Sequence, residues 1–158
     1  MNTPNLDASE VREAEGDDKL TPESEEGRQV LDILHKFFRK ETGSEEKAEQ
    51  MLANLAGTLQ EPGAKLVHLG KTVFLVLVRG KGMVEIHTMS VDDDSVSLAK
   101  SFVLLSKYLK NIGVKLAYTY SNDPKYDLVA KRTRLPIKKR RVVASDGQEY
   151  TAYYLEFQ

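Results

Sequence analysis

Apolar residues first recur at helical spacing after residue 27. Six of them fall on one broad face, which predicts a helix from Arg28 that stops at Glu41-Thr-Gly43; they are Val30, Leu31, Ile33, Leu34, Phe37 and Phe38. Ser44 is a good capping residue and is followed by two glutamates, so a second helix is predicted from there to about Gly57.

Three β segments are predicted next, at residues 65–69, 72–78 and 83–89. The middle segment is almost entirely apolar, and short glycine-containing turns on either side of it favour antiparallel hairpins. The third segment alternates, so that Val84, Ile86 and Thr88 face away from Glu85 and His87.

The remaining pattern alternates helices and strands. A long helix is predicted from Ser95. Its core face is expected to consist of Leu98, Ala99, Phe102, Val103, Leu105, Leu109 and Ile112. A strand at 114–120, a helix that Asp123-Pro124 introduces and a final hairpin at 137–144 and 151–157 follow. The strand–helix–strand order implies one parallel pair. The fold class is therefore mixed α/β, with a mostly antiparallel sheet and flanking helices.

Charge divides the chain into two parts. The first 26 residues carry nine acids against Arg12 and Lys19 and have few large apolar side chains, so we expect residues 1–27 to form a flexible acidic arm and 28–158 to form one domain. There is no cysteine, and the three histidines are scattered, so neither thiol nor metal chemistry is expected. No apolar run could span a membrane, and no secretory signal is visible, so a cytoplasmic location is predicted.

This order of elements resembles that of the GNAT superfamily of N-acetyltransferases. The resemblance covers residues 28–158, although a first strand is not evident. It implies a coenzyme A diphosphate held at a glycine-containing turn before the long helix. The corresponding turn here, Ser90-Val-Asp-Asp-Asp-Ser-Val96, has three carboxylates and no glycine or basic residue. Because these carboxylates would repel phosphates, the sequence predicts that no coenzyme is bound there.

A second family signature, Asn-x-x-Ala-x-x-x-Tyr, is only partly present. Asn122 matches the asparagine and is the candidate cofactor-binding residue, but Lys125 replaces the alanine and Val129 replaces the tyrosine that protonates the departing thiolate. Tyr126 is a substitute acid if the protein is active, or else a packing residue. Glu85 and His87 share a strand face where such enzymes place a general base, and they are the other catalytic candidates. A polar outer strand face would give the same pattern without catalysis.

Seven cations lie within residues 131–141, with no acid among them. They are Lys131, Arg132, Arg134, Lys138, Lys139, Arg140 and Arg141. Such a run is typical of a surface that docks an acidic protein or contacts nucleic acid. No aromatic residue is interleaved with the cations, so protein docking is favoured over nucleic acid. The acidic segment 1–26 of the same chain is one possible occupant.

The degenerate cofactor turn leads to a leading hypothesis of a catalytically inactive GNAT-like structural or interaction protein. Such a protein resembles the GNAT-like virion or assembly proteins of tailed bacteriophages, with no cofactor and with other proteins of an assembly, or further copies of itself, as partners. The alternative is a divergent acetyl-coenzyme A-dependent N-acetyltransferase. A nucleic-acid-associated accessory protein is the second alternative.

Overall fold

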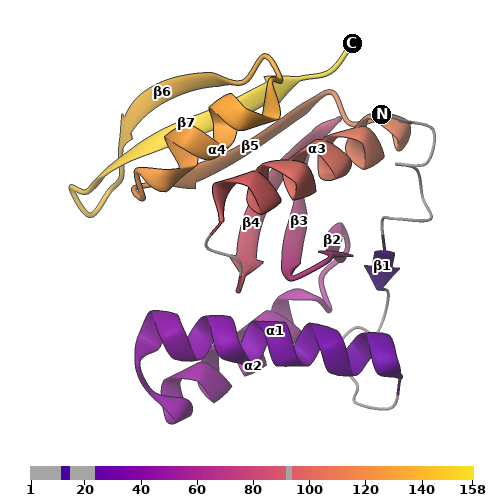
Figure 1. Cartoon of the computed structure of the whole chain (residues 1–158), viewed down its shortest axis with the longest axis vertical. Coiled ribbons are helices and arrows are strands. Elements are labelled where there is room, and N and C mark those ends of the chain that lie inside the picture. Colours follow the sequence, from indigo (N-terminus) through magenta and orange to yellow (C-terminus); the bar gives the residue numbers. More distant parts are fainter. Residues whose placement is uncertain (1–11, 15–23, 92–93) are drawn as a thin grey trace.

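The computed structural model describes residues 12–14, 24–91 and 94–158. Its helices are α1 (Glu25–Thr42), α2 (Glu45–Thr58), α3 (Ser95–Asn111) and α4 (Lys125–Thr133). Its strands are β1 (Arg12–Ala14), β2 (Ala64–Leu69), β3 (Thr72–Gly80), β4 (Met83–Ser90), β5 (Leu116–Ser121), β6 (Lys138–Val143) and β7 (Glu149–Glu156). Helices α1 and α2 lie together, apart from α3 and α4 (Figure 1).

The described strands form a single sheet in the order β1-β2-β3-β4-β5-β7-β6. Every neighbouring pair is antiparallel except β4 and β5, which are parallel because α3 connects them. The predicted fold class, a mixed α/β protein with one parallel pair and flanking helices, is confirmed.

The N-terminal segment holds one element that the sequence did not indicate. Strand β1 pairs with β2, with Arg12 opposite His68. The rest of the predicted flexible arm before Ser24 lies outside the described residues. Helix α1 begins at Glu25, earlier than predicted, because the Ser24 hydroxyl accepts the Gly27 N–H at 2.9 Å.

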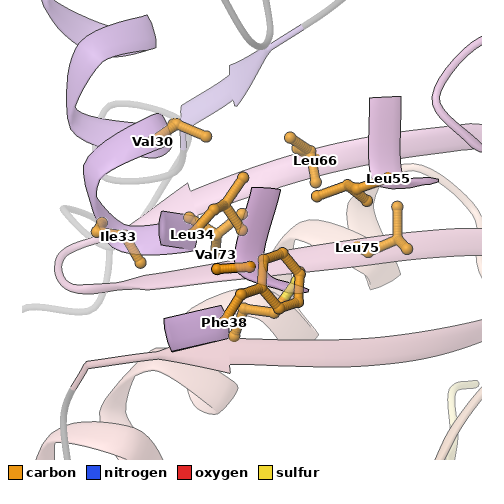
Figure 2. Packing of buried hydrophobic residues seen from close by; sticks show 10 residues of the cluster. Val30, Ile33, Leu34, Phe38, Leu55, Leu66, Val73 and Leu75 are labelled. Atoms are coloured by element: carbon orange, nitrogen blue, oxygen red, sulfur yellow. The ribbon is translucent and has the colours of Figure 1, made fainter. Parts of the chain in front are cut away.

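Helices α1 and α2 cover one face of the β2–β4 part of the sheet. Their apolar side chains pack on Leu66 of β2 and on Val73 and Leu75 of β3, as Figure 2 shows, and on Met89 of β4. The fully buried members include Val30, Leu34, Leu66 and Val73. The buried His68 fixes α1 to this layer, since its Nδ1 lies 2.5 Å from Glu26 Oε2 and its Nε2 lies 2.8 Å from the Gly70 carbonyl oxygen.

Helices α3 and α4 cover the opposite face. Leu98, Leu105 and Leu109 are buried as predicted. Ile112 is not, and its place in the predicted core face is wrong: it follows the last helical residue as the cap and is 51% exposed. Phe102 is partly buried, with its ring centroid 5.0 Å from that of Phe74. None of the described helices combines the length and the apolar character that crossing a lipid bilayer requires.

Candidate active site

The parallel pair β4–β5 is hydrogen-bonded over only three residues. Its register runs from Met83 opposite Leu116 to Glu85 opposite Tyr118. Beyond that point β4 continues to Ser90 on its pairing with β3, and β5 continues to Ser121 on its pairing with β7. The two strands no longer pair with each other there, so the sheet is split between them.

The closed end of this split is fixed by a glycine. The Gly82 carbonyl oxygen accepts the N–H groups of Lys115 at 2.7 Å and Leu116 at 3.0 Å, which ties the turn before β4 to the start of β5. Gly82 has φ +73°, and a Cβ there would lie 3.0 Å from the Lys115 side chain. A larger residue is therefore disfavoured by both backbone strain and contact.

A cleft of about 490 Å³ lies at the open end. Its walls come from β4, β5, the loop after β5 and both helical layers, with Phe37, Phe38, Glu41, Met51 and Asn54 on the α1–α2 side and Lys125 and Tyr126 on α4. The cleft therefore reaches from one face of the sheet to the other. Its size lies within the range of small-molecule binding sites.

The hydroxyl groups of Thr119 on β5 and Thr88 on β4 lie at the split between the strands. The Thr119 hydroxyl donates to the Ile86 carbonyl oxygen at 2.8 Å, which shows that the backbone groups of Ile86 point toward β5. Because backbone direction alternates along a strand, those of Thr88 point the same way, into the split. The Thr88 hydroxyl oxygen is buried and has no hydrogen-bond partner among the described residues. Thr88 thus has hydrogen-bonding capacity to offer an occupant.

The two candidates on β4 form one cluster, as their spacing predicted. Glu85 Oε2 lies 2.8 Å from His87 Nε2, and Glu85 Oε1 accepts from Arg79 Nε at 2.8 Å. Arg79 sits where the β3–β4 register shifts, and this irregularity lets its guanidinium reach Glu85. The hydrogen bond to Glu85 raises the pKa of Arg79. Burial, and then the charge of Glu85, raise the pKa of Tyr118 next to them.

This contact assigns the tautomer of His87. A glutamate carboxylate only accepts hydrogen bonds, so the Nε2 of a neutral His87 carries the proton and donates a hydrogen bond to Glu85. The Nδ1 atom of that neutral ring is then an unprotonated acceptor. His87 is half-exposed and lines the cleft, whereas the Glu85 side chain is 16% exposed. The pair has the geometry of a base held by an orienting carboxylate.

Tyr126 lies in the first turn of α4 and lines the same cleft. Its ring meets that of Phe102 edge-on at 6.3 Å, so the packing interpretation also holds for part of the side chain. Burial, and then the negative charges of Asp123 and Glu41, raise the pKa of Tyr126 to about 12. The phenol therefore stays protonated at neutral pH. Val129, at the position of the family tyrosine, is buried against α3 and leaves that position without an acid.

Asn122 also lines the cleft, in the loop before α4. In that loop Asp123 Oδ1 accepts the Lys125 N–H at 3.0 Å, and the Asp123 N–H donates to the Ser121 hydroxyl at 3.0 Å. These bonds fix the start of the helix one residue beyond Pro124. Glu85, His87, Asn122 and Tyr126 are thus near one cleft, Glu85 through its contact with His87.

The acidic turn before α3 is described only in part. Asp92 and Asp93 lie outside the described residues. Asp94 caps α3: its carboxylate accepts the Val96 N–H and the Ser97 hydroxyl, each at 3.0 Å, and these bonds lower its pKa. One of the N–H groups that a phosphate could use at this helix end, that of Val96, is therefore engaged by the protein's own carboxylate.

The seven basic residues lie on α4, at its C-cap Arg134 and on the edge strand β6, and none of them lines the cleft. Three of them are paired with acids that the run itself lacks: Lys138 with Glu156 at 3.1 Å, Lys139 with Asp127 at 3.2 Å, and Arg141 with Glu149. Lys131, Arg132, Arg134 and Arg140 are exposed. The docking of an acidic partner here stays a prediction.

Sequence reasoning missed several residues of the site. Glu41 was assigned only to a helix stop, Asp123 only to a cap, and Arg79 only to a turn. The alternating pattern of β4 placed Glu85 on the same face as His87, but no local signal indicated the strand irregularity that brings Arg79 to them. Only the fold brings the end of α1 and the start of α4 to one cleft.

The chain was compared with protein families, curated proteins and solved structures. No protein-family model matches the sequence, and a search of curated proteins gives no match. Solved structures do match. A variant of the spermidine N-acetyltransferase of Vibrio cholerae is 9% identical, with 92% of this chain and 94% of that chain covered and a TM-score of 0.65.

Two further solved structures are similar to this chain over most of their length. A protein described as a probable acetyltransferase of the GNAT family from Chromobacterium violaceum is 14% identical, with 96% and 90% covered and a TM-score of 0.64. The structure of AAC(6')-Ib in complex with ribostamycin and coenzyme A is 12% identical, with 92% of each chain covered and a TM-score of 0.62.

These neighbours correct the leading hypothesis from the sequence. They are acetyltransferases, which contradicts the hypothesis of a catalytically inactive phage structural protein and favours the alternative of a divergent N-acetyltransferase. The similarity to phage proteins is not shown. The hypothesis gave too much weight to one turn and could not include the split and its cleft. The chain has the GNAT fold, the fold of these N-acetyltransferases.

Proposed function

We propose that this protein is a divergent N-acyltransferase that transfers the acetyl group of acetyl-coenzyme A to a primary amine. The observation that carries the proposal is the Glu85–His87 pair at the wall of a cleft made by the split between parallel strands. The names of the neighbours, among them a spermidine N-acetyltransferase, support this class of reaction.

The split fits the acyl-bearing arm of the donor better than the turn before α3 fits its diphosphate. Thr88 offers a buried, unpartnered hydroxyl and its backbone groups to an extended molecule in the split. The helix end before α3 instead carries the Asp94 carboxylate, which already accepts the Val96 N–H. The chain therefore holds the donor chiefly through the split. Acetyl-coenzyme A supplies an acetyl thioester there, which an amine nitrogen can attack.

His87 removes the proton that the amine must lose. Amines are protonated at neutral pH, and only the neutral nitrogen is a nucleophile. The Nδ1 atom of His87 accepts this proton, while Glu85 holds the ring and stabilises the imidazolium that forms. Arg79 donates a hydrogen bond to the other carboxylate oxygen of Glu85 and so helps to fix its orientation.

Tyr126 supplies the proton that the departing thiolate of coenzyme A accepts. Its raised pKa keeps the phenol protonated, and its hydroxyl has no hydrogen-bond partner among the described residues. It is thus available to donate a proton to a departing thiolate. Asn122, in the preceding loop, lines the same cleft and contributes a side-chain amide to the donor site.

The test is steady-state acetyl transfer from acetyl-coenzyme A to a panel of primary amines, followed by release of the free thiol. Because the protein has no cysteine, it contributes no thiol background. His87→Gln should lower kcat about 10²- to 10⁴-fold, the usual contribution of a positioned base. Glu85→Gln should lower kcat less and change its pH profile, since the base remains but its orienting charge is lost.

The chain offers a matched control at the α1–α2 surface. His35 Nε2 lies 2.7 Å from Glu45 Oε2, the same kind of pair, but neither residue lines the cleft. His35→Gln should leave kcat unchanged. The proposal is overturned if the unmodified protein releases no thiol above the uncatalysed rate with any amine, or if His87→Gln and His35→Gln behave alike.

A further inference from the structure

Two carboxylates from distant parts of the chain face one volume of the cleft. Glu41 lies in the last turn of α1, and Asp123 lies in the loop between β5 and α4. Both line the cleft, and both negative charges act on the Tyr126 phenol, whose pKa they raise. Two negative charges from distant parts of the chain therefore act on the same ring.

The two carboxylates differ in their present partners. The Glu41 carboxylate forms no hydrogen bond or ion pair with any other residue that the structure describes, and Glu41 is exposed. Asp123 Oδ2 lies 3.9 Å from Lys125 Nζ, at the outer limit of an ion pair. The Glu41 carboxylate and the Oδ2 atom of Asp123 are therefore available to a ligand, while Asp123 Oδ1 accepts the Lys125 N–H.

The protein places an ammonium group of its own in this environment. Lys125 Nζ lies 5.5 Å from the centroid of the Tyr126 ring, within the range of a cation–π contact, and beside Asp123. Lys125 also lines the cleft. A primary alkylammonium is thus already accommodated between a carboxylate and an aromatic ring, and the same surroundings suit the alkylammonium group of a ligand.

We propose that the acceptor is an aliphatic di- or polyamine, whose second ammonium group is held by Glu41 and Asp123 at the Tyr126 ring. This rests on the proposed function and names its substrate class. The second ammonium takes the place of Lys125 Nζ, and the aliphatic chain lies along the apolar wall that Phe37, Phe38 and Met51 provide. An acceptor bearing a carboxylate is repelled, and a monoamine leaves Glu41 unused.

The first test compares a diamine with a monoamine of the same chain length in acetyl transfer. The diamine should have the lower KM. Glu41→Gln and Asp123→Asn should each raise its KM about two- to fivefold, the effect of one exposed charge pair, and leave the monoamine KM unchanged. The asparagine keeps the side-chain oxygen that accepts the Lys125 N–H, so α4 retains its start. Glu46→Gln, which removes an exposed acid outside the cleft, is the control.

The second test changes the internal ammonium. Lys125→Met removes the charge that competes with the ligand, so the diamine KM should fall by about two- to fivefold. Loss of a merely structural contact would move KM the other way or not at all. The opposite signs expected at Lys125 and Glu41 therefore separate a cation site from a general effect on the fold.

Calorimetric titration of the full chain with the diamine alone separates this inference from the proposed function. Binding that Glu41→Gln with Asp123→Asn abolishes supports the cation site even if no amine is acetylated. Acetyl transfer with equal KM for diamine and monoamine, unchanged in the variants, overturns the inference and leaves the function standing. Absence of both diamine binding and any KM difference also overturns it.

Discussion

The two halves of the sheet are built from different kinds of side chain. Strands β2, β3 and β4 bury aliphatic residues and Phe74 on both faces, between α1–α2 and α3. Strands β5, β7 and β6 carry most of the tyrosines, and β6 is almost entirely exposed and basic. The first half supplies stability, and the second supplies polar groups at its surface. The split that holds the cleft lies where the two halves meet.

Deletion of a core side chain in the first half should have the largest effect on stability. Phe74 is fully buried on β3 and contacts the Phe102 ring, so Phe74→Ala should lower the free energy of unfolding by about 3 to 5 kcal/mol. Val143→Ala on β6, where the side chain is 68% exposed, should change it by less than about 0.5 kcal/mol. Denaturant unfolding of both variants measures the difference. Similar losses would show that the halves contribute alike.

High pH should lower the free energy of unfolding through two tyrosines, Tyr126 on α4 and Tyr153 on β7. Burial raises the pKa of Tyr126 to about 12, and burial with the hydrogen bond to Asp127 raises that of Tyr153 to about 12. Below pH 10 these phenols are protonated in both the folded and the unfolded chain, so their contribution to the free energy of unfolding is fully present. Between about pH 10 and 12 the unfolded chain loses these protons first, so stability falls as pH rises.

For Tyr126 this loss should amount to about 2 kcal/mol over that window. Tyr126→Phe cannot ionise, so its unfolding free energy should depend less steeply on pH between 10 and 12. Denaturant unfolding at a series of pH values measures the slopes. Equal slopes for the variant and the unmodified protein would show that the phenol is not shielded in the folded state.

The smallest effect is expected at the basic edge strand. The Lys138–Glu156 pair is exposed on both sides, so Lys138→Gln should cost about 0 to 1 kcal/mol, and less in high salt. Thermal unfolding at low and high ionic strength checks this. A large, salt-independent loss would mean that β6 is part of the stabilising core, which would remove the contrast between the halves.

The sequence predicted the helices and strands that the local periodicity of apolar residues determines. The helical spacing of Val30 and Leu34 and the apolar run of β3 identified the elements and the side chains that they bury. Strand β1 gave no signal, because three residues, Arg-Glu-Ala, have no β pattern and pair only because the edge of β2 is available.

The sequence indicated four residues of the candidate site: alternation along β4 placed Glu85 and His87 on one face, and the family resemblance pointed to Asn122 and Tyr126. The contacts that complete it join residues far apart in the chain. Glu41 and Asp123 act on one phenol because α1 and the loop after β5 line the same cleft. The acids that pair with the basic run are on α4 and β7, so a count of charges within residues 131–141 overstates the free positive charge.

The two-sided lining of the cleft has a kinetic consequence for the proposed reaction. In the proposed reaction the acceptor lies between the α1–α2 side and the Tyr126 ring, whereas the donor arm lies in the split at Thr88, so neither has to displace the other. Donor and acceptor can therefore be bound at the same time. We therefore expect the proposed transfer to proceed directly within a ternary complex, with the initial-rate pattern of a sequential rather than a double-displacement enzyme, and to need no nucleophile that carries the acetyl group between two half-reactions.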